Sequence, residues 1–178
     1  FFPTALVDKN FDSFSDNNLY PIGSLPNKDS LLCDEGYGIV NYKSDRFGLR
    51  NPDINWDKAF TSNTIYFIGD SFTQGFCVEE EATITRRIES IIQQNVLNLG
   101  FGGNGPIEYI ALLNTIVNPI ILNSSSLEND VVIVFYENDN IQENKKNLNL
   151  ALSANNVVRQ FKNKGYRPSL EYVKAITN

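Results

Sequence analysis

Three short apolar runs in the second half of the chain predict buried strands. Residues 64–68, 96–99 and 131–136 are rich in β-branched, leucine and aromatic side chains, and the first two end at Gly69 and Gly100. Runs of this length and composition are typical of buried strands. The third run has no polar alternation, so we expect both of its faces to be covered, as in a parallel sheet.

Helical spacing separates these runs. Within residues 79–94 the isoleucines at 84, 88, 91 and 92 form one apolar stripe, and acidic residues occupy the first turn. Residues 106–117 predict a second helix, which Pro106 opens. Residues 140–163 predict a partial helix and residues 168–177 another short one. Strand, helix, strand, helix, strand predicts right-handed βαβ units in a doubly wound α/β sheet.

The first third of the chain has a different character. Residues 1–60 carry scattered Asn, Asp, Gly and Pro with no sustained period. We therefore divide the chain into an N-terminal arm, residues 1–60, which packs on an α/β domain, residues 61–178. The apolar residues 1–7 have two interpretations, the end of an upstream anchor or signal and a simple hydrophobic contact. Because the sequence contains no Met, we expect a processed or excised piece of a longer chain.

Composition narrows the function classes. The net charge of −6 leaves no basic footprint for duplex nucleic acid, and no apolar run approaches the roughly 18 residues of a membrane span. The sequence has no His, so a mechanism that needs an imidazole base cannot be completed within these residues. Cys33 and Cys77 are compatible with one disulfide or with two free thiols, and they are too few for a zinc site.

Small and amide-bearing residues follow all three predicted strands, at the edge where open α/β sheets bind ligands. Residues 69–71 read Gly-Asp-Ser, residues 98–104 read Asn-Leu-Gly-Phe-Gly-Gly-Asn, and residues 137–139 read Glu-Asn-Asp. A serine such as Ser71 can act as a nucleophile there, while backbone N–H groups and an Asn side chain stabilise an oxyanion. The alternative for Ser71 is a helix N-cap. Asp70 is expected to steady the turn, and Asn138 has the alternative role of a cap.

These three segments resemble the first three blocks of the SGNH (GDSL) hydrolase superfamily. The resemblance covers about residues 20–140 and implies a flavodoxin-like three-layer α/β sandwich with a mostly parallel sheet. It implies that Ser71 is the catalytic nucleophile and that Ser71, Gly103 and Asn138 form the oxyanion hole, with support from the neighbouring residues Asp70, Asn104 and Asp139. The family usually has Gly where this chain has Glu137. Its fourth block, Asp-x-x-His, is absent, so we expect the fold to be incomplete at its C-terminus.

The arm resembles the lead-in of a bacterial branch of these proteins, in residues 33–37 and 42–53. That branch commonly follows an N-terminal membrane anchor and lies in the periplasm or at the cell surface. The resemblance also implies a Cys33–Cys77 disulfide. For Arg46 and Arg50, which flank a turn at Gly48, a salt bridge or surface role is the default expectation.

The resemblance implies a serine esterase or O-acyltransferase that acts on small acyl esters, acetyl groups of a surface carbohydrate among them. No metal or organic cofactor is required, and the sequence does not indicate an oligomeric state. The alternative is a binding or scaffold protein that keeps the fold without turnover. Residues 100–105 also satisfy the dinucleotide motif G-x-G-x-x-G. Two features argue against a dinucleotide site: Pro106 removes an N–H group from the helix start, and no acidic residue ends a strand about 20 residues further on.

Overall fold

The computed structural model describes residues 23–24, 27, 29–34, 39–124 and 126–136. The predicted helices at 140–163 and 168–177 and the apolar residues 1–7 lie outside this part. The strands are β1 (Asp29–Asp34), β2 (Ile39–Lys43), β3 (Thr64–Gly69), β4 (Asn95–Gly100) and β5 (Asp130–Ile133). The helices are α1 (Ile54–Lys58), α2 (Ser71–Gln74), η2 (Glu80–Ala82), α3 (Ile84–Ile92), α4 (Pro106–Leu112), η3 (Leu113–Val117) and α5 (Asn118–Asn123).

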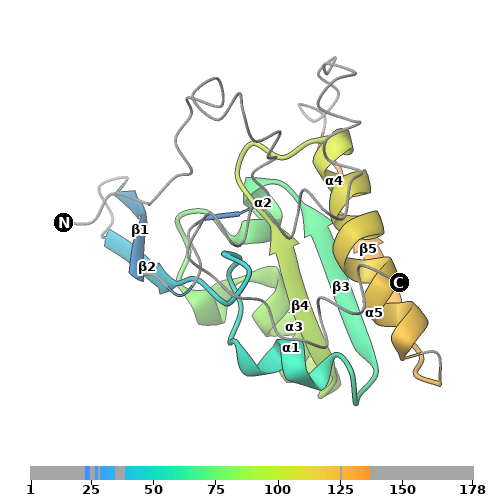
Figure 1. Cartoon of the computed structure of the whole chain (residues 1–178). Coiled ribbons are helices and arrows are strands. Elements are labelled where there is room, and N and C mark those ends of the chain that lie inside the picture. Colours follow the sequence, from blue (N-terminus) through green and yellow to red (C-terminus); the bar gives the residue numbers. More distant parts are fainter. Residues whose placement is uncertain (1–22, 25–26, 28, 35–38, 125, 137–178) are drawn as a thin grey trace.

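A parallel three-stranded sheet forms the centre, with the strand order β4-β3-β5. Tyr66 pairs with Leu97 of β4 and with Val131 of β5, so all three predicted strands align in one sheet. Helices α2 and α3 connect β3 to β4, and the segment α4–η3–α5 connects β4 to β5. Figure 1 shows that segment along one side of the sheet and the β1–β2 hairpin on the other. The predicted α/β class with parallel strands is therefore confirmed.

The main core joins the sheet to both flanking parts of the chain. Its fully buried members include Tyr66 and Leu97 from the sheet, Leu112 from α4, and Phe47 and Trp56 from the predicted arm. The rings of Phe47 and Trp56 pack edge to face with centroids 4.4 Å apart. Residues 47–59 thus contribute to the same core as the sheet, while the division of the chain at residue 60 stays a prediction.

The helices begin and end differently from the predicted spans. The span 79–94 is divided, because Thr83 adopts an extended conformation between η2 and α3 and its hydroxyl caps α3 by accepting from the N–H of Arg86. The span 106–117 continues to Asn123 through the π-helical turn η3. Pro119 has no N–H to donate to the preceding turn, which is a common cause of such local irregularity.

The prediction that both faces of the third strand are covered is wrong for β5. Val131, Val132 and Ile133 are exposed by 37%, 37% and 52%. β5 pairs with β3 alone and forms an edge of the described sheet. Its side chains therefore have a neighbouring strand on one side only, which leaves them more exposed than those of the central strand β3. The continuous apolar run therefore identified the strand correctly but overestimated how far it is buried.

The arm contains regular structure that the sequence pattern did not reveal. β1 and β2 form an antiparallel hairpin with a register shift between Leu31 and Cys33. In β2, Val40 and Tyr42 are buried while Asn41 and Lys43 are exposed, which is the alternation of a half-buried strand. The run of five residues is short, so its alternation gives little signal in the sequence.

Side chains from the arm and from α3 cover the outer edge of β4. The amide of Asn51 accepts from the N–H of Asn98 at 2.6 Å and donates to its carbonyl at 2.9 Å. Asn55 and Arg86 both donate to the carbonyl of Val96, at 3.2 and 2.8 Å. These bonds satisfy edge groups that would otherwise be open to another strand.

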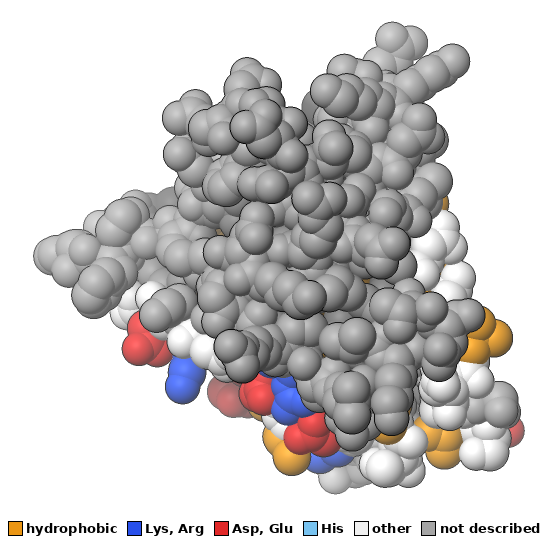
Figure 2. All heavy atoms as spheres, viewed as in Figure 1, with side chains coloured by type: hydrophobic (Ala, Val, Ile, Leu, Met, Phe, Trp, Pro, Cys, Tyr) orange, Lys and Arg blue, Asp and Glu red, His pale blue; other side chains and the backbone are white. Residues whose placement is uncertain are grey.

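The surface carries charges of both signs. Figure 2 shows acidic and basic side chains interspersed along the lower edge of the visible face. Within the described residues, none of the helices has the length and apolar character needed to cross a membrane.

Candidate functional site

Ser71 lies directly after β3, at the first position of α2. Asp70 takes the N-cap position, and its carboxylate accepts a hydrogen bond from the N–H of Phe72 at 2.9 Å. Asp70 thus has the turn-steadying role that we expected. Ser71 is half-buried, and its hydroxyl makes no hydrogen bond within the described part of the chain. The structure therefore gives the capping role to Asp70 and leaves the Ser71 hydroxyl available.

Two glycines allow α2 to pack directly against the ends of β3 and β4. A Cβ atom at Gly69 would lie 2.0 Å from Oγ1 of Thr73, and one at Gly100 would lie 2.3 Å from the backbone nitrogen of Gln74. Any other residue at these positions would push α2 away from the sheet edge. Gly69 and Gly100, the last residues of β3 and β4, thus allow Ser71 to lie close to the sheet edge.

The glycine loop after β4 lies beside Ser71. A Cβ atom at Gly102 would be 3.7 Å from Cβ of Ser71, and the N–H of Gly102 donates to Oε1 of Gln74 at 2.9 Å. Gly103 is exposed with φ +87°, and its N–H has no hydrogen-bond acceptor within the described residues. The loop therefore uses one N–H to hold α2 and leaves the next one open.

Asn104 is buried, and the structure gives its side chain no clear role at this site. Its backbone N–H donates to Phe101, and its carbonyl accepts from the hydroxyl of Tyr109. Its amide nitrogen has no hydrogen-bond partner in the described part of the chain and is closed to solvent. The expectation that Asn104 supports the site stays a prediction.

The end of the third strand also reaches α2. Val134 continues the pairing beyond β5 by donating to the carbonyl of Ile68 at 2.8 Å. The rings of Tyr136 and Phe72 then lie with centroids 4.7 Å apart, which places the end of this segment beside the residue after Ser71. Asn138 and Asp139, like Glu137, lie outside the described residues.

A buried chain of amides connects the site to the arm. Asn98 donates from its amide to the carbonyl of Thr73 in α2 at 2.8 Å and accepts from the N–H of Gly100 at 2.9 Å. Asn51, which brackets the backbone of Asn98, also donates to Asp45 at 2.8 Å. Asp45 in turn accepts from Trp56 and from the N–H groups of Phe47 and Leu49. Burial raises the pKa of Asp45 to about 6, although all four hydrogen bonds act to lower it.

Sequence reasoning missed this connection. A polar residue within an apolar strand was the available signal for Asn98, because a buried amide must find partners. Asp45 and Asn51 lie in the stretch 42–53, where the sequence has no sustained period that would indicate buried positions.

Arg50 is buried, which corrects the expectation of a salt bridge or surface role. Its guanidinium donates to the carbonyls of Gly75 and Val78, at 2.7 and 2.8 Å, and lies 5.6 Å from the centre of the Tyr42 ring. Burial lowers the pKa of Arg50, and the nearby Glu80 acts against this. Arg46, in contrast, forms the expected salt bridges, with Asp53 and Asp57.

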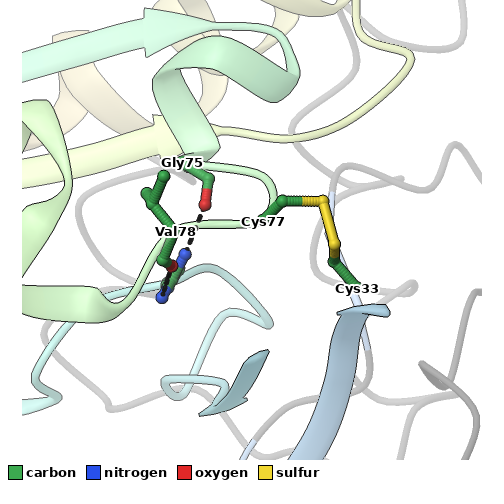
Figure 3. The surroundings of a disulfide bond; sticks show 5 residues. Cys33, Gly75, Cys77 and Val78 are labelled. Atoms are coloured by element: carbon green, nitrogen blue, oxygen red, sulfur yellow. Dashed lines mark hydrogen bonds between the residues drawn. A yellow bond between two sulfur atoms is a disulfide. The ribbon is translucent and has the colours of Figure 1, made fainter. Parts of the chain in front are cut away.

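The Cys33–Cys77 disulfide is present and links β1 to the loop that follows α2. Figure 3 shows the bond beside the carbonyls of Gly75 and Val78, to which hydrogen bonds run. Cys77 has φ 62°, a left-handed conformation that is uncommon for residues other than glycine. Arg50 and the disulfide thus hold the same loop from the side of the arm.

A cavity of about 420 Å³ opens between α2 and the start of α3. Ser71 contributes to its wall together with the loop residues that the disulfide holds. The lining side chains are mostly apolar, and they are Phe72, Phe76, Cys77, Val78, Ala82, Thr83 and Ile84.

The structure also bears on the dinucleotide interpretation. Gly105 stands before α4, and its N–H donates to the carboxylate of the buried Glu108 at 3.0 Å. A pyrophosphate at this helix start would face that carboxylate and would lack the N–H group that Pro106 removes. Among the described residues, no group of three His, Cys, Asp or Glu side chains is placed to hold a metal ion.

Comparisons with known proteins found no matching family model, no matching curated protein and no matching solved structure.

Proposed function

We propose that this chain carries the nucleophile and oxyanion elements of an SGNH-type serine esterase or O-acyltransferase. The observation that supports this most directly is the placement of Ser71. Ser71 lies at the carboxyl edge of a parallel sheet and is half-buried. Its hydroxyl does not cap α2, because the adjacent Asp70 is the N-cap residue. The strand order, second-first-third, is the one that flavodoxin-like sheets begin with, which favours the finer fold assignment.

In the proposed reaction the Ser71 oxygen forms a bond to the carbonyl carbon of an ester. The serine proton passes to a base and then to the departing alcohol, as the bond between the carbonyl carbon and the alcohol oxygen breaks. Water or a sugar hydroxyl then takes the acyl group from Ser71. The N–H groups of Ser71 and Gly103 and the amide of Asn138 would stabilise the oxyanion. The N–H of Ser71 is available because the first N–H groups of a helix have no partner within it.

The base has to come from outside these residues. None of the 178 residues is a histidine, so the Asp-x-x-His block that the resemblance implies is not supplied by this sequence. A serine without a base is a weak nucleophile, and activity then rests on the oxyanion elements alone.

The proposed substrates are small acyl esters, acetylated surface carbohydrate among them, and the proposed location is the periplasm or the cell surface. The disulfide supports that location, because such bonds persist in oxidising compartments. A membrane anchor upstream of residue 1 belongs to the same proposal.

One observation favours a second candidate, a binding or scaffold protein with this fold. The Ser71 hydroxyl has no hydrogen-bonded base within the described part of the chain. A protein of that kind would retain its ligand after the serine hydroxyl is removed.

The experiment compares the chain with Ser71→Ala on an activated ester, nitrophenyl acetate, with imidazole added as an external base. We expect acetyl transfer to Ser71, seen as one added acetyl group in the intact mass and located by peptide mapping. After the rate with imidazole alone is subtracted, we expect nitrophenol release to be about tenfold or more faster than from Ser71→Ala, because a diffusing base gives less than the roughly 10²-fold of a positioned one.

Ser124→Ala is the control, since Ser124 is a buried serine at the end of α5 whose hydroxyl donates to Ile120. Equal rates for the original chain and Ser71→Ala, with no acetyl on Ser71, would reject catalysis and favour the binding protein.

A further inference from the structure

The cavity beside Ser71 has an apolar character that the proposed function does not explain. Phe72, Phe76, Val78 and Ile84 line it, and these side chains are exposed by 55%, 46%, 38% and 46%. Covering these side chains is favourable, because each Å² of apolar surface removed from water contributes about 25 cal/mol of free energy. Four such side chains around one hollow form a concentrated patch rather than scattered exposed residues.

Among the described residues, no charged side chain lines the cavity, although the acidic residues 79–81 lie in the adjoining turn. Thr83 and Ser71 supply its polar side chains. The hydroxyl of Thr83 is already used, because it donates to the carbonyl of Glu80 at 2.8 Å. Ser71 therefore supplies the polar side chain that is still available in the described lining, which is otherwise mostly apolar.

A disulfide, two hydrogen bonds and close packing hold the wall of the cavity in place. The disulfide fixes Cys77, and the guanidinium of Arg50 binds the carbonyls on either side of it, at Gly75 and Val78 (Figure 3). In addition, a Cβ atom at Gly75 would lie 2.5 Å from Cγ2 of Thr83, so the loop packs tightly against the start of α3. A preorganised wall lowers the ordering cost of binding.

We infer that this cavity binds the hydrocarbon part of the acyl group, and that among the small acyl esters of the proposed function the chain prefers straight-chain esters longer than acetyl over acetyl itself. The inference rests on the proposed function, because the acyl group is the part of the substrate that becomes bonded to Ser71. Ligand cavities range over about 300–1,000 Å³. An acetyl group alone would leave most of this cavity, about 420 Å³, unfilled.

The first test measures binding without chemistry. Methyl ketones from butanone to octanone carry a carbonyl next to a growing alkyl chain and are not hydrolysed. We expect affinity for the full chain, measured by NMR titration, to rise about two- to fourfold for each added methylene, because each buried methylene is favourable. Affinity that does not change with chain length would overturn the inference.

A matched pair of variants locates the binding. Ala82→Trp places an indole in the cavity from the exposed turn η2, whereas Leu122→Trp adds the same indole to α5 at a position that is 76% exposed. We expect Ala82→Trp to weaken octanone binding by about tenfold or more and Leu122→Trp to leave it unchanged. Equal effects of the two variants would place the ketone elsewhere and reject the cavity as the site.

The second test separates this inference from the proposed function. With nitrophenyl acetate, butyrate, hexanoate and octanoate as substrates, the Ser71-dependent rate should rise with acyl length in the original chain and lose that rise in Ala82→Trp. Ser71-dependent turnover with no preference for acyl length would retain the proposed function and overturn the inference. Ketone binding that Ala82→Trp abolishes, together with no turnover, would support the apolar site and reject the esterase.

Discussion

Asp45 shows at the scale of one residue how the arm is joined to the candidate site. Its carboxylate is fully enclosed and accepts four N–H groups, two from the backbone and one each from Asn51 and Trp56. Asn51 then carries the connection to Asn98 and so to α2. A buried acceptor with four donors is costly to replace, because each donor left unpaired keeps its desolvation penalty.

We expect Asp45→Asn to lower the free energy of unfolding by about 2 kcal/mol, because the amide NH₂ group faces two of the four donors. The measurement is urea denaturation followed by circular dichroism. Asp57→Asn is the control, since that carboxylate is 55% exposed in its salt bridge with Arg46 and such pairs contribute about 0–1 kcal/mol. Equal stability of Asp45→Asn and the original chain would show that the network does not hold the arm.

The pH dependence of stability has an unusual sign at Asp45. Burial raises its pKa in the folded chain to about 6, from 3.8 for an unperturbed Asp. Between these values the folded chain holds a proton that the unfolded chain has released. Stability from this group is therefore full below about pH 4, declines as the pH rises to about 6, and is constant above that.

The expected decline is about 3 kcal/mol, since one pKa unit corresponds to 1.36 kcal/mol. Unfolding free energies of the original chain and Asp45→Asn, measured from pH 4 to 8, check this expectation. The difference between the two proteins should change only below about pH 6. A difference that is independent of pH would contradict the assignment of the titration to Asp45.

At the scale of the elements, the close contact of α2 with β4 depends on Gly100. A methyl group there would lie 2.3 Å from the nitrogen of Gln74 and 2.6 Å from the carbonyl carbon of Thr73, both backbone atoms that have little room to move. We expect Gly100→Ala to cost about 1–3 kcal/mol and to reduce Ser71-dependent activity, because α2 has to move off the sheet. Thermal denaturation and the ester assay measure the two effects.

Gly102→Ala is the matched control for this prediction. Its methyl group would meet Oε1 of Gln74 at 3.4 Å and Cβ of Ser71 at 3.7 Å, which are near-ordinary contacts. We expect this variant to keep the stability of the original chain. A loss in Gly102→Ala as large as that in Gly100→Ala would show that the loop, and not the contact of α2 with β4, limits stability.

The central strands were predictable from the sequence because composition and the terminal glycines both marked them. The start of α3 was not, since acidic residues 79–81 suit a first helical turn and only the cap at Thr83 divides η2 from α3. The exposure of the β5 side chains could not be predicted from the hydrophobic pattern either. An apolar run shows that the side chains of a strand are suited to burial, whereas the position of the strand in the sheet decides how far they are buried.

For the whole molecule, the sequence predicts where Ser71 lies, but it does not predict the long-range contacts that hold Ser71 and its loop in place. The order of strands and motifs placed Ser71 and the glycine loop at one sheet edge. Asn98 and Arg50 act through contacts over 25 residues or more along the chain, and local periodicity carries no information about those. Asn138, the third predicted oxyanion group, lies beyond the described residues, so its role stays a prediction.

The disulfide is the covalent link between the arm and the site, and it closes a loop with a sequence separation of 44. Chain entropy gives an upper-end stabilisation of about 4 kcal/mol for such a loop. We expect the double variant Cys33→Ser, Cys77→Ser to have an unfolding free energy lower by up to about 4 kcal/mol, as measured by urea denaturation. Reductant should destabilise the original chain by a similar amount and leave the double variant unchanged.

The same link should matter more for the cavity than for Ser71. Without it, Cys77 loses its tie to β1, while Asp70 and the Asn98 amide still hold α2. We therefore expect the double variant, at temperatures where it stays folded, to lose the preference for long acyl chains before it loses acetyl transfer. Parallel loss of both would show that the loop after α2 and the nucleophile form one mechanical unit.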